Sequence, residues 1–227
     1  MSAERTLSHF AAFTLDREHW LQPEGVHREV LEPWLHELRQ AAARVEAYQI
    51  YPARCGADLL VWSALPADDP AAPARFFEAF ARATRRIRAY LHPSLTLWGF
   101  TRPSPYARRG SDRAIDAIAG ERLPYLVVYP FVKTAEWYGK PAEERQAMMN
   151  EHIKVGRSHE GVRQLLLYSF GLQDQDFVVV YETADLAGFS DLVRELRETE
   201  ARRYTERDTP IFTGVLRPAG SELSLWV

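Results

Sequence analysis

The sequence contains an internal repeat whose period is close to half of the chain length. A strand-like apolar run, a long amphipathic helix and a second apolar run follow one another twice. The two copies cover 58–103 and 176–218. Gly99 and Gly214 stand 115 residues apart within these copies, and Asp58 and Asp176 stand 118 apart. Two nearly equal spacings indicate a duplicated unit, with a coincidental echo as the alternative, and each copy would have to form the same supersecondary structure.

Completing each copy from its apolar periodicity adds two strands and one helix per half. The added strands are 7–15, 45–52, 123–132 and 162–170, and the added helices are 27–43 and 141–157. Each half then has the order β-α-β-β-α-β, which is the ferredoxin-like unit. We therefore expect an α+β protein with a duplicated ferredoxin-like fold (a dimeric α+β barrel), antiparallel sheets and outer helices. Its parts would be an N-terminal half at 1–105, a linker at 106–122 and a C-terminal half at 123–227.

Composition excludes several classes of protein. The chain has 227 residues, of which 46 % are hydrophobic, so it can bury a full core. Its net charge of −3 does not favour nucleic acid or an anionic membrane as a partner. The single Cys55 excludes an internal disulfide and a thiolate cluster. Since no apolar leader or long apolar span is present, we expect a cytoplasmic protein without a membrane span.

A histidine lies on the apolar side of the helix expected at 141–157. Met148, His152 and Val155 recur at the spacing of one helix face, which predicts that the imidazole points inward. Spacing alone favours a core histidine with a hydrogen bond, because no second metal ligand stands beside it. The alternative is that His152 holds a ligand.

The segment between the halves, at 101–122, is rich in arginine. It carries five Arg against three acidic residues. A solvated linker is one interpretation. The other is a cover that presents guanidinium groups to an anionic ligand.

The second half resembles the chlorite dismutase family of haem proteins and, within it, the coproheme decarboxylases. The resemblance spans about 122–217, through "LPYLVVYPFVKTAEWY", "EERQAMMNEHIKVGR", "LYSFGLQDQDFVVVYET" and "LRETEARRYTERDTPIFTG". The first half matches in architecture only. The resemblance implies a homopentamer in which each C-terminal half binds haem b or iron-coproporphyrin III.

By this resemblance His152 is the proximal iron ligand, and an imidazole nitrogen is a standard axial ligand because a porphyrin supplies the other four donors. The family supports this histidine with a carboxylate from the last helix, which counting back from Pro210 places at Glu200. A solvated helix charge is the alternative for Glu200. Trp137 matches a tryptophan that the family places beside the haem, with an ordinary core role as its alternative.

The other side of the haem separates the subfamilies. Chlorite dismutases carry an arginine there, on the strand after the ligand helix. Counting back from Gly171 reaches Gln164, whereas counting forward from His152 reaches Leu165. We prefer Gln164, because the match around Gly171 is tight, and Arg163 would then point to the opposite face.

Tyr129 and Lys133 match the tyrosine and lysine of the decarboxylases, and their even spacing puts both on one face of a strand. The implied reaction uses hydrogen peroxide to oxidise Tyr129 to a radical, which takes a β-hydrogen from a coproheme propionate, so that carbon dioxide leaves and a vinyl group remains. Lys133 would pair with the propionate. Arg197 matches a family arginine that is a propionate or structural partner, whereas Arg202 replaces an adjacent family serine. A packed strand aromatic is the alternative for Tyr129.

The expected function is thus peroxide-dependent coproheme decarboxylation to haem b, an oxidoreductase reaction. The first alternative is a chlorite dismutase or haem peroxidase, which the missing arginine disfavours. The second is a non-catalytic haem-binding protein, because matching residues do not prove turnover.

Overall fold

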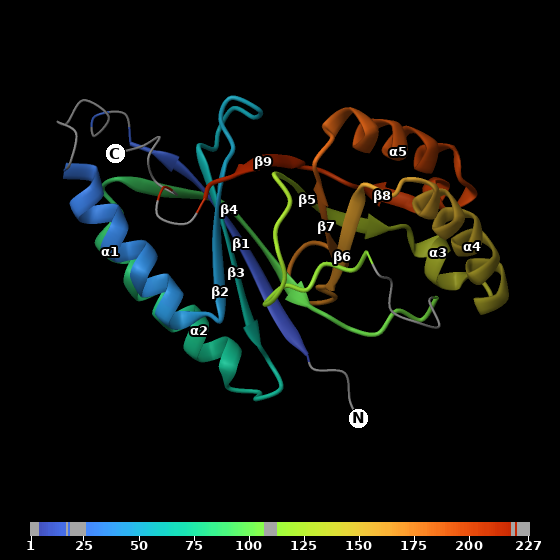
Figure 1. Ribbon diagram of the computed structural model, residues 1–227. Coiled ribbons are helices and arrows are strands. Elements are labelled where there is room, and N and C mark those ends of the chain that lie inside the picture. The colour runs from blue at the N-terminus through green and yellow to red at the C-terminus, as the bar shows by residue number, and fades with distance from the viewer. Residues whose placement is uncertain (1–4, 17, 19–25, 107–112, 219–220, 222–227) are drawn as a thin grey trace.

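The computed structural model describes residues 5–16, 18, 26–106, 113–218 and 221. Its strands form one nine-stranded sheet with the order β7-β6-β4-β1-β3-β2-β9-β5-β8, and β7 also pairs with β5. This last pairing closes the sheet into a ring. Helices α1 and α2 lie outside one part of the ring and α3, α4 and α5 lie outside the other (Figure 1).

The first half is one ferredoxin-like unit. Its elements are β1 (Thr6–Leu15), α1 (Val26–Ala41), β2 (Arg44–Gln49), β3 (Leu59–Pro66), α2 (Ala72–Arg86) and β4 (Leu91–Phe100). The strands lie side by side in the order β4-β1-β3-β2. In terms of the unit's own strands, this order is 4-1-3-2.

The second half repeats that order. Its elements are β5 (Tyr125–Lys133), α3 (Ala135–Gly139), α4 (Ala142–Ser158), β6 (Val162–Tyr168), β7 (Phe177–Thr183), α5 (Leu186–Glu198), the 3-10 helix η2 (Glu200–Tyr204), β8 (Thr205–Arg207) and β9 (Phe212–Leu216). Strands β9, β5, β7 and β6 are neighbours in that sequence, which is again 4-1-3-2. The duplicated ferredoxin-like fold with antiparallel sheets, expected from the sequence, is confirmed.

The halves join at two short junctions of the same kind. Strand β4 pairs with β6 through Phe100 and Tyr168. Strand β2 pairs with β9 through Tyr48–Leu216 and Gln49–Val215. At each junction the fourth strand of one unit meets the second strand of the other.

The two repeated glycines lie at these junctions. A Cβ atom on Gly99 would lie 2.6 Å from Ser169 Oγ and 2.7 Å from the Tyr168 carbonyl oxygen. A Cβ atom on Gly214 would lie 2.8 Å from the Cβ of Tyr48. Both positions therefore need a residue without a side chain, which explains why glycine recurs in the repeat.

The two repeated aspartates also play equivalent roles. Asp58 accepts a hydrogen bond on Oδ2 from the Leu15 N–H, at the end of β1, over 2.8 Å. Asp176 accepts one on Oδ2 from the Lys133 N–H, at the end of β5, over 2.9 Å. Each carboxylate thus satisfies the last amide of the first strand in its own unit.

The apolar core has separate clusters inside and outside the ring. The interior cluster includes Phe10, Trp62, Val128 and Leu165. An outer cluster under α1 and α2 includes Phe13 and Trp34, and another outer cluster packs α5 on the second sheet. Alternate residues of a strand therefore serve different clusters.

The last predicted helix is shorter than expected. The repeat predicted one long amphipathic helix between the two apolar runs of 176–218, but α5 ends at Glu198 and η2 begins at Glu200. Thr199 between them is extended, with φ −71° and ψ 150°. Its hydroxyl donates a hydrogen bond to the Leu196 carbonyl oxygen over 2.7 Å, which is a local backbone contact that competes with helix continuation. Within the described residues, no helix combines the length and apolarity needed to span a membrane.

We expect Gly99→Ala to lower the free energy of unfolding by about 1–3 kcal/mol, because the new methyl group would overlap backbone atoms at the junction. Urea denaturation followed by circular dichroism measures this change. Gly161→Ala is the control, since nothing lies within 4 Å of its added Cβ. Equal stability of the two variants would contradict the close approach.

Candidate functional site

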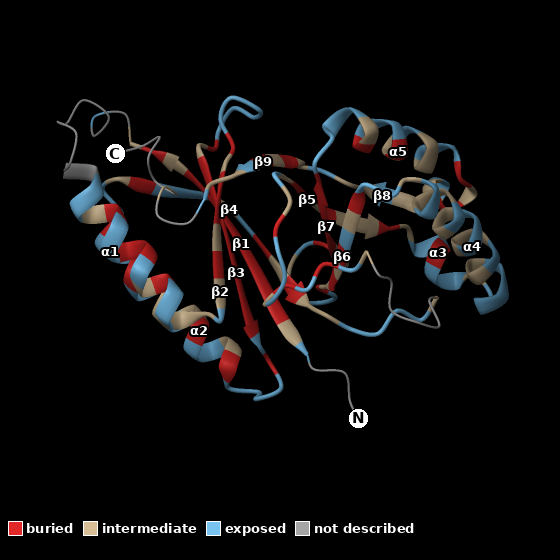
Figure 2. Ribbon diagram, viewed as in Figure 1, coloured by how far each residue is buried: buried red, intermediate tan, exposed pale blue. Residues whose placement is uncertain are grey.

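Helix α4 contacts the rest of the protein differently from the other long helices. It packs on α5 and η2. The structure describes all of α4, and none of its residues is fully buried (Figure 2). In contrast, α1 buries Leu31, Trp34, Leu35 and Leu38. The apolar stripe of α4 thus keeps accessible surface that a bound ligand can cover.

His152 lies half-buried on this stripe. Its Nδ1 atom lies 3.4 Å from Thr199 Oγ1. Burial, and after it the positive charge of Lys133, lowers the pKa of His152 to about 4, so the ring is neutral at pH 7. Among the described residues Nε2 makes no hydrogen bond. A neutral imidazole with a free nitrogen has the chemistry of a metal ligand.

The partner expected for His152 is a different residue in the structure. We expected Glu200, but its carboxylate lies 3.4 Å from Arg203 Nε. Its backbone N–H donates to Glu151 Oε2 over 3.1 Å. The break after α5 explains this difference, because it brings Thr199 to His152 and turns Glu200 outward. The sequence predicted a continuous helix here, and in a continuous helix the contact of His152 with Thr199 could not be foreseen.

Lys133 and Trp137 are buried together beside this helix. Lys133 Nζ donates to the Ala201 carbonyl oxygen over 2.7 Å and lies 4.3 Å from the centre of the Trp137 ring. Burial, and then the positive charge of Arg202, lowers the pKa of Lys133 to about 8. Trp137 is 3 % exposed and its helix is capped by the Thr134 hydroxyl. The structure therefore brings Lys133, Trp137 and η2 together.

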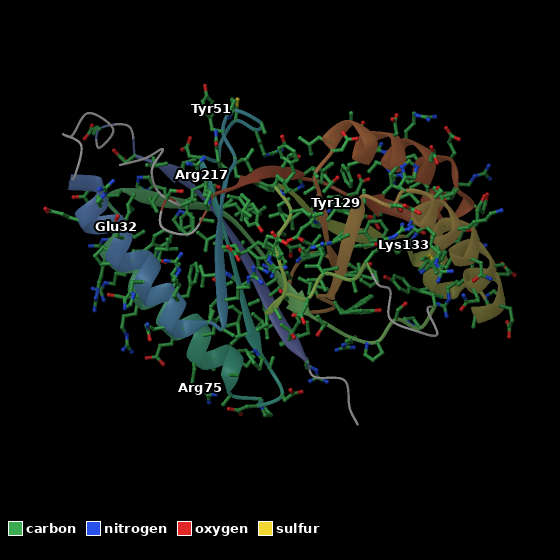
Figure 3. The ribbon with its side chains drawn as sticks, viewed as in Figure 1. Glu32, Tyr51, Arg75, Tyr129, Lys133 and Arg217 are labelled. Atoms are coloured by element: carbon green, nitrogen blue, oxygen red, sulfur yellow. The ribbon has the colours of Figure 1, made fainter. Side chains whose placement is uncertain are left out.

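Tyr129 lies on β5 on the same outer face as Phe131, and Figure 3 shows Tyr129 and Lys133 in the half covered by α3, α4 and α5. Its ring centre is 6.1 Å from that of Tyr181, whose hydroxyl interacts electrostatically with that of Tyr129. Burial, followed by the effects of Tyr181 and Asp208, raises the pKa of Tyr129 well above its usual value. The phenol therefore keeps its proton in the resting protein.

A charged group borders this tyrosine. Arg197 and Arg202 both contact Asp208, with N–O distances of 3.6 and 3.3 Å. Arg197 and Asp208 act electrostatically on Tyr129, and Arg202 acts on Lys133. Arg202, which appeared as a departure from the family pattern, thus supplies a second guanidinium beside Arg197. Sequence spacing did not reveal Asp208 or Tyr181 as members of this group.

Gln164 lies on the same face of the sheet as Tyr181, its direct partner across β6 and β7. The Gln164 side chain is exposed. Leu165 belongs to the interior cluster, and Arg163 donates to the Glu121 carbonyl oxygen over 2.8 Å. Of the three residues considered from the sequence, Gln164 is the one that shares the outer face.

The segment before β5 is anchored rather than loosely solvated where the structure describes it. Arg113 donates to the carbonyl oxygens of Gly156, Arg157 and His159 at the end of α4, over 3.0–3.3 Å. Arg122 is buried, with its guanidinium 4.3 Å from the Trp62 ring centre and 3.5 Å from Glu182 Oε1. These two arginines bind the protein itself. Arg108 and Arg109 lie outside the described residues.

The donor atoms around His152 suit a metal that already carries most of its own ligands. The described residues contain no cluster of three or more His, Cys, Asp or Glu that could hold a metal ion. One free imidazole nitrogen, with accessible apolar surface around it and cations nearby, fits a metal whose remaining donors come from the ligand.

Comparison with known proteins identifies the family. A family model described as chlorite dismutase matches residues 26–217. The chain belongs to the chlorite dismutase family.

Two kinds of relatives are similar to this chain. A coproheme decarboxylase of Mycolicibacterium smegmatis is 34 % identical over 168 residues, which cover 74 % of this chain and 70 % of the relative. Chlorite dismutase from Candidatus Nitrospira defluvii in complex with imidazole has a TM-score of 0.80 at 26 % identity, over 97 % of this chain and 94 % of that one. A double mutant of that enzyme has a TM-score of 0.81 at 26 % identity, with the same coverage.

We expect Arg113→Met to lower the free energy of unfolding by about 1–2 kcal/mol, because it removes donors from the carbonyl oxygens at the end of α4. Amide hydrogen exchange in the last turn of α4 should become faster. Arg157→Met is the control, because it removes an equal charge from the last turn of α4. Its free energy of unfolding should change by no more than about 0.5 kcal/mol. If both variants exchange alike, Arg113 does not anchor the helix.

Proposed function

We propose that this protein is a coproheme decarboxylase, an oxidoreductase that uses hydrogen peroxide to convert two propionates of iron-coproporphyrin III into the vinyl groups of haem b. The main supporting observation is that an oxidisable phenol, Tyr129, lies within electrostatic range of Arg197 and Asp208, and that Asp208 also contacts Arg202. The similarity to a coproheme decarboxylase agrees with this function.

In this proposal the substrate lies between α4 and the outer face of the second sheet. His152 ligates the iron through Nε2, and the Trp137 ring, held by Lys133, borders the macrocycle. Arg197, Arg202 and Lys133 supply positive charge for the carboxylates, with guanidinium groups suited to bidentate pairing. Gln164, exposed on the sheet face that carries Tyr181, would face the bound substrate from the sheet.

The reaction balances for each propionate. One R–CH2–CH2–COOH and one H2O2 give R–CH=CH2, CO2 and two H2O. The bound iron with peroxide supplies the oxidising equivalents. Tyr129 would give an electron and its proton to the peroxide oxidant, which ends as water, and would then take a β-hydrogen from the propionate. Loss of CO2, a proton and a second electron would then leave the vinyl group, with the electron and proton going to the same oxidant.

The direct test loads the protein with ferric coproheme, titrates hydrogen peroxide and follows the tetrapyrrole mass. Two successive losses, each of the mass of formic acid, are the expected result. Rapid oxygen release from chlorite would instead support a chlorite dismutase, which we do not expect because the neutral amide of Gln164 lacks the charge to hold chlorite. Binding without turnover of either substrate would leave a non-catalytic haem-binding protein. Homopentamer formation and a cytoplasmic location stay predictions.

Replacing Tyr129 separates chemistry from binding. Tyr129→Phe keeps the ring and deletes the hydroxyl, so coproheme affinity should change by about 1 kcal/mol at most, whereas decarboxylation should fall by orders of magnitude. Mass spectrometry of the porphyrin measures the effect. Tyr168→Phe, on the same face of the sheet but on β6, is the control and should keep its activity. The opposite pattern would move the radical role to Tyr168.

Replacing His152 tests ligation. His152→Ala should shift the absorbance of bound coproheme and weaken its retention, while the stability of the ligand-free protein changes little because the side chain is only half-buried. His159→Ala is the control, since that histidine also lies by the end of α4 but contacts Glu195 Oε2 at 3.1 Å. An unchanged spectrum in folded His152→Ala would refute the assignment.

A further inference from the structure

The contact between His152 and Thr199 has a counterpart in the first half. There the Trp34 Nε1–H donates to Thr84 Oγ1 over 3.4 Å. The contact between His152 Nδ1 and Thr199 Oγ1 is also 3.4 Å. In both halves a ring on the first long helix of the unit, α1 or α4, thus meets a threonine hydroxyl at the end of the second long helix, α2 or α5.

The spacings show that these contacts are equivalent positions of the repeat. Trp34 and His152 stand 118 residues apart, as the two repeated aspartates do. Thr84 and Thr199 stand 115 apart, as the two repeated glycines do. The two halves therefore share the threonine at this position and differ in the ring that contacts it, which is an indole in the first half and an imidazole in the second.

The surroundings of the two rings differ. Trp34 is 2 % exposed and meets the Phe13 ring edge-on at 5.4 Å, so its bulk fills the first half's outer layer. The smaller His152 leaves its helix partly accessible. The side chain at this repeated position is thus buried in the first half and partly exposed in the second.

The hydrogen-bond roles follow from the donors. An indole has only a donor, so the Thr84 hydroxyl must accept. The Thr199 hydroxyl already donates its single hydrogen to the Leu196 carbonyl oxygen over 2.7 Å, so it too must accept from a ring. His152 therefore carries its proton on Nδ1, and its lone pair is on Nε2.

From this geometry we infer that Thr199 is a positioning residue that fixes the Nδ1–H tautomer of His152 and aims Nε2 at the ligand. Its hydroxyl is neutral, in contrast to the carboxylate expected from Glu200. The assignment of the Nδ1–H tautomer does not depend on the proposed function. The orientation of Nε2 toward coproheme iron does rest on the proposed function.

The first experiment uses the ligand-free protein. With ¹⁵N-labelled histidine, nuclear magnetic resonance at neutral pH should show His152, one of seven histidines and assigned with His152→Gln, as the Nδ1–H tautomer. Thr199→Val should lose this preference and Thr199→Ser should keep it. Thr84→Val makes the same substitution at the equivalent position and should leave the His152 signals unchanged.

A second experiment measures coproheme binding by absorbance. Thr199→Val should weaken affinity by about 10–100-fold, the usual effect of losing the partner of a ligating histidine, and Thr199→Ser should restore it. Thr84→Val should bind like the wild type.

The outcomes separate the two claims. An Nε2–H tautomer in the wild type, or an unchanged tautomer in folded Thr199→Val, would overturn the inference whatever the activity. The expected tautomer without decarboxylation would remove only the proposed function. If Thr199→Val does not fold, the wild-type and Thr199→Ser spectra still decide.

Discussion

The structure depends on two places where a neighbouring strand leaves no room for a side chain, at Gly99 and Gly214. There the fourth strand of each unit meets the second strand of the other, and only a residue without a side chain fits. These contacts turn two open four-stranded sheets into one closed ring. With the inner faces packed against each other inside the ring, each unit has one outer face left for its helices.

Those outer faces are used differently. In the first half Trp34 and Phe13 fill the layer beneath α1. In the second half α4 packs on α5 and η2, and its apolar stripe remains partly accessible. A site thus arises where one unit omits the large side chain that the other unit uses, and the polar groups of β5, α5 and η2 then border the open face.

Much of this was predictable from sequence, because repeated residues report geometry. The spacings of Gly99–Gly214 and Asp58–Asp176 predicted the duplication, and periodicity placed His152 on the inward face of its helix. Counting from Gly171 through the family resemblance selected Gln164 over Arg163 and Leu165. The partner of His152 was not predictable, because a helix pattern continues smoothly through Thr199, whereas the actual backbone turns there. Arg113 was equally hidden, since its acceptors are carbonyl oxygens, which carry no sequence signal.

The symmetry of the two junctions has an evolutionary consequence. A single ferredoxin-like unit with a glycine at this position would close the same ring by pairing with a second copy of itself. In such a homodimer one gene would encode both copies, so any substitution at one site would also appear at the other. With both units in one chain, the two equivalent positions can differ. The first unit carries the indole of Trp34, which fills its outer layer, and the second carries the imidazole of His152. The first half thus contributes to the candidate site by closing the ring that holds the second sheet, and not by supplying a ring nitrogen of its own.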